Sequence, residues 1–286
     1  MSNTATTELA REIMLEFARL TGLSPARAHP RRYLWTDAFA VCNYLEFYSQ
    51  TNNKAHLDLA LQLVDQVHHV LGKHRGDDPR QGWISGLDAQ QGEEHPTVGG
   101  LRIGKQLNER KPNEPSDERL EWDQDGQYYH YLTKWMHALN CVSQDTGDPA
   151  YIRWAIELAK TAYAKFTFAP SYGDRKRMHW KMSIDLSYPL VPSMGQHDPL
   201  DGFVTYCELQ AAAANYLDGS SYPALGHEIV DMARICQGIQ LPTNDPLGIG
   251  GLLYDACRIA QLIAKGQIRN PSLFLNVIPR SLLRMG

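Results

Sequence analysis

The sequence lacks the features of several specialised classes of protein. Its 286 residues carry 28 basic and 32 acidic side chains, a formal charge of −4, and no long basic run. Because a nucleic-acid-binding surface concentrates Lys and Arg in patches, we do not expect a nucleic-acid partner. Residues 1–20 intersperse charged with apolar side chains and so lack the uninterrupted apolar core of a secretory signal. No segment suggests a membrane span, and we expect a cytoplasmic protein with no membrane partner.

Cysteines and cofactor motifs are also scarce. The cysteines are odd in number and lie far apart in the sequence, and we interpret them as free thiols packed as small apolar side chains. They are Cys42, Cys141, Cys207, Cys236 and Cys257. A metal site built on His197 and Asp198 or Asp201 is possible, but no two histidines stand at a recognised zinc spacing beside an acid, and His68-His69 suits the surface of an outer helix. The glycines of residues 99–105 do not match a dinucleotide fingerprint. We therefore predict no metal and no cofactor.

Apolar residues recur along much of the sequence at the intervals that place them on one face of a helix. With 43% hydrophobic and 21% charged residues, the chain can bury a large core, and we predict one domain over residues 1–286. Capping and stop signals predict eight helices, and a ninth begins near Pro271. The eight span residues 8–20, 36–50, 55–74, 123–145, 149–168, 200–217, 222–237 and 247–265.

The connections between these helices alternate in length. Residues 51–54, 146–148 and 218–221 are turns so short that the helices they join must be antiparallel neighbours. The connections before the second, fourth, sixth and eighth helices are long, aromatic and acidic. If even-numbered helices form an inner ring and odd-numbered helices an outer ring, every long connection reaches the N-terminus of an inner helix. All of them then lie on one face.

Two long connections carry patterns of short strands. Residues 99–105 have the glycine punctuation of a tight loop or hairpin. Residues 178–186 alternate imperfectly, as in a short strand that points Trp180 and Lys181 to different faces. The predicted fold is therefore all-α, an α/α toroid of helical hairpins with short β-hairpin excursions in the long loops.

Acidic residues mark the starts of the inner helices. Trp35-Thr36-Asp37 opens the second, residues 121–126 (Glu-Trp-Asp-Gln-Asp-Gly) open the fourth, and residues 196–202 (Gln-His-Asp-Pro-Leu-Asp-Gly) open the sixth. Helix capping, which contributes ~1 kcal/mol, explains some of these acids. Asp125 and Asp201 lie beyond the cap position, and each precedes a glycine that leaves a gap where a ligand could approach.

Flat and polar side chains accompany these acids. Four of the six tryptophans lie in the long connections or at their junctions with inner helices, where a sugar-binding face would place apolar platforms; they are Trp35, Trp83, Trp122 and Trp180. One polar stripe follows the fourth helix at spacings of three and four. Its members are Asp123, Gln127, His130, Lys134 and His137. On an inner helix such a stripe would line the lumen.

These strings resemble the inner-helix starts of the six-hairpin, (α/α)6-toroid glycosidases and related sugar epimerases and lyases. The resemblance covers most of the chain at the level of architecture, and none of the strings is a signature of one enzyme family. It implies a saccharide substrate and a carbohydrate-active site at the mouth, with paired carboxylates and aromatic platforms. A closed toroid needs twelve helices. Three interpretations of the shorter chain stay open: truncation, a toroid incomplete at its C-terminus, or fewer hairpins.

The predicted function is glycoside hydrolysis. Cleavage needs one carboxylic acid to protonate the leaving oxygen and a second carboxylate to activate water or attack carbon. The predicted catalytic pair is Asp125 with Asp201, and Asp37 and Asp198 are the substitutes. The predicted substrate-binding residues are Trp35, Trp122, Gln127, Tyr129, His130, Trp180, Lys181, His197 and Arg102. Inversion or retention, the sugar and the oligomeric state stay open.

Three other functions use the same residues differently. An epimerase or isomerase would use His130 and His197 as base and acid. A polysaccharide lyase would need a base together with cations that neutralise a uronate, which Arg102, Lys105 and Lys181 could supply. A non-catalytic helical binding or scaffold protein would use the acids only as caps, and side chains would fill its mouth.

Overall fold

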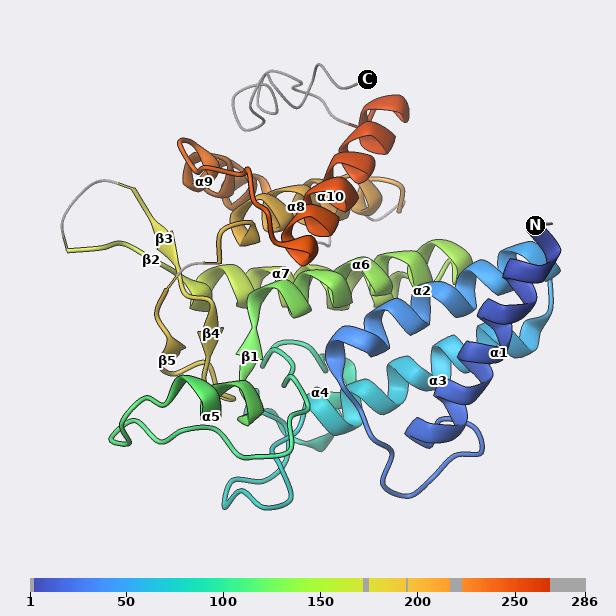
Figure 1. Ribbon diagram of the computed structural model, residues 1–286, viewed down its shortest axis with the longest axis horizontal. Helices are drawn as coiled ribbons and strands as arrows, with labels where there is room; N and C mark the ends of the chain where they lie inside the picture. Colours follow the sequence, from blue (N-terminus) through green and yellow to red (C-terminus); the bar gives the residue numbers. More distant parts are fainter. Residues whose placement is uncertain (1–2, 172–174, 194, 217–222, 268–286) are drawn as a thin grey trace.

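The computed structural model describes residues 3–171, 175–193, 195–216 and 223–267, and this part of the chain is mostly helical (Figure 1). Its helices are α1 (Asn3–Thr21), α2 (Leu34–Thr51), α3 (Lys54–Leu71), α4 (Ala89–Glu94), α5 (Glu118–Asp123), α6 (Tyr129–Thr146), α7 (Pro149–Phe166), α8 (Asp198–Ala213), α9 (Gly226–Cys236) and α10 (Pro246–Ala264). Its strands are β1 (Gln127–Tyr128), β2 (Thr167–Phe168), β3 (Arg177–Met178), β4 (Lys181–Met182) and β5 (Pro189–Val191). The all-α prediction with short strands in the long loops is confirmed.

Three helical hairpins, α2–α3, α6–α7 and α8–α9, form the body of the protein. Asn52 (φ 53°) and Gly147 (φ 72°) end α2 and α6 in the left-handed conformation that stops a helix. Asn53 and Asp148 then cap α3 and α7 through their side chains. The hairpins α2–α3 and α6–α7 are therefore each set by two turn residues, as the short connections predict. The predicted turn at residues 218–221 lies outside the described residues.

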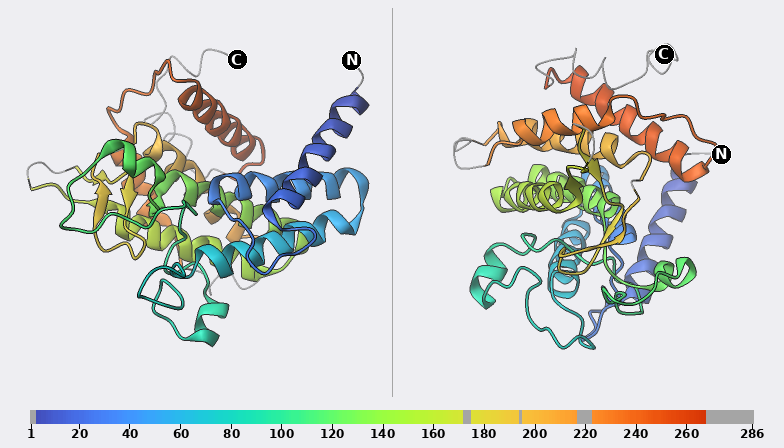
Figure 2. Two further views of the ribbon diagram at one scale, coloured as in Figure 1. Left: turned by 60° about the horizontal axis from the view of Figure 1, so that its bottom comes forward. Right: turned by 90° about the vertical axis from the view of Figure 1, so that its left-hand side faces the viewer.

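The hairpins stack through their first helices. α2 packs against α6, α6 against α8, and α8 against α10. α1 packs on α2 at one edge of this row, and α10 lies at the other (Figure 2). The described helices thus form an arc with one inner row, which is the α/α arrangement expected from the alternating connections. The buried core lies between the hairpins, and Trp135 of α6 is fully buried in it.

The fourth predicted helix was wrong at its start. Instead of one helix over residues 123–145, α5 ends at Asp123 and α6 begins at Tyr129, with β1 between them. Gly126 has φ 145°, which interrupts a helix, and the Asp125 carboxylate accepts hydrogen bonds from the amides of Gly104 and Gly126 at 2.9 and 3.1 Å. Asp125 and Gln127 therefore lie in a connection and a strand rather than on an inner helix.

Other predictions were partly correct. Residues 99–105 form no strand, whereas β4 pairs with β1 and β5, and β2 pairs with β3. Trp180 is partly exposed and Lys181 is fully buried, so the two side chains point to different faces, as predicted. The predicted ninth helix near Pro271 lies outside the described residues.

His68 and α10 depart from expectation. His68 is buried rather than at the surface. Trp135 Nε1 donates a hydrogen bond to its Nε2 at 3.2 Å, and burial lowers the pKa of His68 to about 3.

Within the described residues, α10 is the one helix long and apolar enough to cross a membrane, judged by length and composition alone. Its charged residues, Asp255 and Arg258, are buried, whereas Leu253 is exposed.

Candidate functional site

An aromatic patch lies where α2 and α6 begin. Its members are Tyr33, Trp35, Trp122, Tyr128, His130, Tyr131 and Trp180. The centre of the His130 ring lies 5.7 Å from that of Trp35 and 6.2 Å from that of Trp180, and the His130 and Trp180 rings are nearly parallel. The first turns of α2 and α6 and the long connections before α2, α6 and α8 supply these side chains. The pairing of Tyr128 with Lys181 places Trp180 beside them. The patch offers several partly exposed flat surfaces of the kind on which sugars stack.

An acidic cluster, Asp198, Asp201 and Asp255, adjoins this patch. Asp198 Oδ1 lies 3.7 Å from His130 Nδ1, so the start of α8 meets the start of α6. Asp201 Oδ1 accepts a hydrogen bond from Lys134 Nζ at 2.7 Å, and its other oxygen accepts one from the Thr133 hydroxyl. All three carboxyl groups are buried. The inner helices α6, α8 and α10 therefore bring acids and a histidine together beside the aromatic patch.

Burial separates the protonation states of these acids. Burial and the charge of Asp201 raise the pKa of Asp198 to about 8, and burial raises that of Asp255 to about 8 as well. Burial also opposes ionisation of Asp201, but Lys134 and Arg258 together hold its pKa below the usual value. At neutral pH the cluster thus contains one carboxylate beside protonated carboxylic acids.

His130 is neutral at the same pH. Burial lowers its pKa to about 4. Its Nδ1 and Asp198 Oδ2 are buried and make no hydrogen bond within the described residues, whereas Asp255 Oδ1 lies 3.5 Å from Arg258 Nη1. A buried polar atom without a partner costs about 1–3 kcal/mol, so His130 Nδ1 and Asp198 Oδ2 are poised to bind a ligand's polar groups.

The predicted pair Asp125 and Asp201 is not brought together. Asp125 is fully buried and pairs with Arg102 at 2.5 Å and Arg75 at 3.2 Å. In the described structure it shares no hydrogen-bond or ion-pair partner with Asp201. Asp201 lies instead next to Asp198, which the sequence nominated as a substitute.

The two predicted glycine gaps are filled by protein. A Cβ on Gly202 would lie 2.1 Å from the Tyr129 hydroxyl, and one on Gly126 would lie 2.8 Å from a main-chain oxygen of β4. These glycines therefore permit close packing rather than the approach of a ligand. A Cβ on Gly195 would lie 2.4 Å from Asp198 Oδ2, so Gly195 likewise permits the close approach of the Asp198 carboxyl group.

Four predicted substrate-binding residues are buried and bonded to protein. Arg102 pairs with Asp125, and Lys181 Nζ donates to main-chain oxygens at 2.7 and 2.9 Å. Gln127 bridges main-chain groups at 2.7 to 3.0 Å, and the Tyr129 hydroxyl donates to Tyr206. These contacts hold the long connections against the inner helices. Trp35, Trp122, His130 and Trp180 are the predicted residues that the patch contains.

Asp37 and His197 are bonded to other parts of the protein, although Asp37 also accepts a hydrogen bond from the amide of Tyr33 at 2.9 Å. Asp37 is buried 3.6 Å from Arg32, and burial raises its pKa to about 7. His197 Nε2 lies 3.0 Å from a main-chain oxygen of the connection before α10. In the described part of the chain, His197 and His130 share no contact. The two histidines predicted for an epimerase do not converge.

A basic cavity of about 1010 Å³ lies on the other side of the patch. α1, the start of α2 and the connection at residues 102–107 enclose it, and its lining has five basic and two acidic side chains. Tyr33 belongs to both the cavity and the patch, and Lys105 Nζ lies 5.4 Å from the centre of its ring. The acidic cluster does not line this cavity. Three of the five basic side chains are paired with acids that do not line the cavity: Arg32 with Asp37, and Arg75 and Arg102 with Asp125. Arg31 and Lys105 are the lining cations that suit an anionic group of a ligand that also contacts the patch.

Sequence reasoning missed the contribution of α10. Asp255 joins the acidic cluster, and Arg258 lies 3.4 Å from Asp201 Oδ1. The signal was present, because these are the two charged residues in the whole of α10 and stand three positions apart on one face. A charged pair in an apolar helix indicates a buried polar contact.

Comparisons with known proteins give one distant structural likeness. No family model and no curated protein matches the chain. Among solved structures, the chain is similar to an unsaturated glucuronyl hydrolase from Bacillus sp. GL1, described as responsible for the degradation of glycosaminoglycan, with 14% sequence identity and a TM-score of 0.41. The match covers 72% of this chain and 45% of that chain, so the chain spans less than half of that enzyme. A likeness of this extent assigns neither residues nor an activity.

Proposed function

We propose that the chain is a carbohydrate-active enzyme that hydrolyses a glycosidic bond between the aromatic patch and the acidic cluster. The observation that carries this proposal is the position of His130. Its ring belongs to the patch, and its Nδ1 lies 3.7 Å from Asp198 Oδ1. A sugar stacked on Trp35 or Trp180 would thus lie beside a carboxylic acid and a neutral imidazole.

The protonation state of each residue indicates its role in the proposed hydrolysis. Asp198, with a pKa of about 8, holds a proton at neutral pH that it can give to the leaving glycosidic oxygen. Asp201 is ionised and can stabilise the positive charge that develops on the sugar ring. His130 is neutral and can accept the proton of an attacking water. Asp198 thereby replaces Asp125 in the pair that the sequence suggested.

The pH dependence of kcat/KM follows from these states. The base His130 must be unprotonated, so kcat/KM falls as pH decreases through about 4. The acid Asp198 must be protonated, so kcat/KM falls as pH increases through about 8. Initial rates measured from about pH 3 to about pH 9, roughly one unit beyond each limb, check this. A rate that stays constant through the alkaline limb would exclude Asp198 as the acid.

Removal of the stacking surface should weaken substrate binding. We expect Trp180→Leu and Trp35→Leu each to raise KM by about 3- to 10-fold with a smaller change in kcat, because an aromatic pair contributes about 0.5–1.5 kcal/mol beyond its buried area. The matched control is Trp154→Leu, since Trp154 lies on α7 outside the patch. Equal KM values for all three variants and the unaltered enzyme would contradict a sugar platform here.

A proton NMR time course with neutral and uronic-acid-containing oligosaccharides identifies the reaction. Acidic members belong in the panel because the basic cavity adjoins the patch at Tyr33. Hydrolysis gives a new reducing-end anomeric signal, whereas an epimer or an unsaturated product would point to the epimerase or lyase alternative. Binding without turnover by any member of the panel would favour a non-catalytic role.

A further inference from the structure

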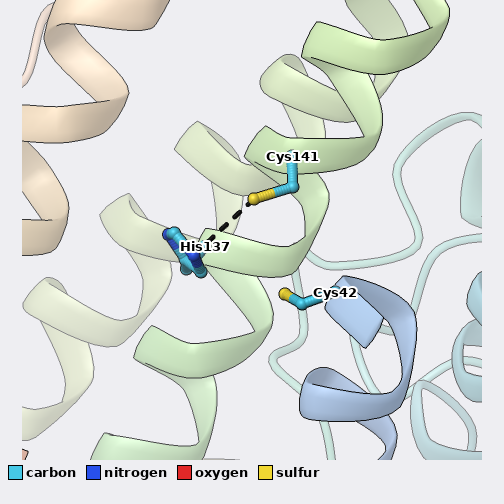
Figure 3. A group of neighbouring side chains, drawn as sticks. All are labelled: Cys42, His137 and Cys141. Atoms are coloured by element: carbon cyan, nitrogen blue, oxygen red, sulfur yellow. Dashed lines mark hydrogen bonds between the residues drawn. The ribbon is translucent and has the colours of Figure 1, made fainter. Parts of the chain in front are cut away.

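Three side chains that the proposed hydrolysis does not use meet between α2 and α6 (Figure 3). Cys42 lies on α2, and His137 and Cys141 lie one turn apart on α6. One ligand atom from each, two Sγ and an imidazole nitrogen, lies within 4.8 Å of the other two. Thiolate and imidazole together are the donors that Zn²⁺ prefers in proteins.

The spacing fits a tetrahedral ion. A sulfur at ~2.3 Å and a nitrogen at ~2.1 Å from one zinc ion lie about 3.6 Å apart at the tetrahedral angle. His137 Nε2 and Cys141 Sγ lie 3.6 Å apart. His137 and Cys141 stand four positions apart on one face of α6, and Cys42 lies beside them on α2 (Figure 3).

The imidazole is held in the orientation that a metal ligand needs. His137 Nδ1 lies 2.8 and 3.1 Å from the two oxygens of Glu208, and this contact leaves Nε2 to face the sulfurs. Asn140 donates to the same carboxylate at 2.9 Å, and Arg258 Nε donates at 3.1 Å. A carboxylate behind a histidine fixes the ring and increases its basicity, which is the usual outer shell of a metal-bound histidine.

We propose that Cys42, His137 and Cys141 bind one Zn²⁺ ion through two thiolates and the imidazole Nε2. Binding breaks two S–H bonds and one N–H bond of the His137 imidazolium, forms two Zn–S bonds and one Zn–N bond, and releases three protons. The two thiolates then neutralise the charge of the ion. The three ligand residues are only partly buried, which leaves room for a water or a small ligand at the fourth position.

The proposed ion would join two parts of the inner row. It bridges α2 and α6 directly, and through Glu208 and Arg258 it is connected to Asp201 of the acidic cluster. The ion would therefore stabilise the inner helices and fix the arginine that holds Asp201 ionised. The zinc site does not depend on the proposed hydrolysis, because its donors and spacing stand without any substrate.

Cobalt substitution tests the site directly. The full-length chain is reduced, freed of metal with a chelator, assayed for free thiols, and titrated with Co²⁺ without oxygen. We expect one Co²⁺ per chain, with a sulfur-to-cobalt charge-transfer band and the strong visible bands of tetrahedral cobalt. Cys42→Ser should remove about half of the charge-transfer intensity and weaken Zn²⁺ competition by at least about 10-fold, since even outer-shell changes have effects of that size.

Cys257 provides the control for the cysteines of the cluster. Cys257→Ser removes an exposed thiol of α10 outside the cluster and should leave the cobalt spectrum unchanged. Zn²⁺ should raise the melting temperature of the unaltered chain and of Cys257→Ser, and that of folded Cys42→Ser much less. If Cys42→Ser does not fold, Cys141→Ser takes its place. A fully reduced protein without these bands, or bands of unchanged intensity in both serine variants of the cluster, would overturn the proposal and leave packed thiols.

Discussion

Asp198→Asn should lower kcat by about 10²- to 10⁴-fold while the protein remains folded, because removal of a general acid costs that range of rate. Asparagine keeps the size and neutral charge that the protonated carboxyl has at neutral pH, but it has no proton to transfer. Steady-state kinetics and thermal unfolding of the same preparation separate the two effects. The alkaline decrease in kcat/KM should disappear from the residual activity of the variant.

The same substitution has a pH-dependent effect on stability. The folded-state pKa of Asp198, about 8, lies above its ordinary value of 3.8, so its contribution to stability is complete below pH 3.8 and is lost as pH rises through about 8. Asp198→Asn has no such group. Its melting temperature should therefore rise relative to that of the unaltered protein between those two pH values.

A matched acid at another helix start serves as the control. Asp245 caps α10 through its side chain and is exposed to solvent. Asp245→Asn should leave kcat unchanged and cost at most about 1 kcal/mol, because asparagine is itself a good cap. A similar loss of kcat in both variants would indicate that Asp198 acts as a cap rather than as an acid.

The helices could be predicted because two signals agreed along the chain. Apolar spacing marked the long helices, and turns of three or four residues predicted which of them are antiparallel neighbours. The helices α4 and α5 have only six residues each and were missed, because so short a segment shows no helical period. The prediction failed at residues 123–128, where local pattern and tertiary contact conflict. The carboxylate of Asp125 is taken by Arg102 and by backbone amides of the preceding connection, which the helical period cannot reveal.

The candidate site could be predicted in its residue types but not in its pairing. Trp35, His130 and Asp198 were named from their places at helix starts, and the structure brings these three into one neighbourhood. Which acid meets which depends on the rotation of each inner helix, and that rotation is set by packing around buried side chains such as Trp135. For the same reason, the sequence could not show that Cys42 meets Cys141, although His137 and Cys141 share one face of α6.

Asp125→Asn should lower the stability of the fold far more than it lowers the activity of the folded enzyme. The carboxylate accepts charged hydrogen bonds from Arg102 at 2.5 Å and Arg75 at 3.2 Å, and both of its oxygens are occupied by protein. Removal of one partner from a buried ion pair costs about 3–5 kcal/mol. For a chain of this size, that corresponds to a decrease in melting temperature of roughly 10 °C.

The alternative role predicts the opposite result, so one experiment decides between them. If Asp125 were a catalytic acid, the asparagine variant would keep its melting temperature and lose kcat; if it is a structural anchor, kcat measured well below the melting temperature stays within about threefold of the original. Asp123→Asn, an exposed acid two positions away, should change neither. Replacement of Arg102 by methionine in the Asp125→Asn background should cost less than the sum of the single changes, because the second substitution removes the buried charge that the first one strands.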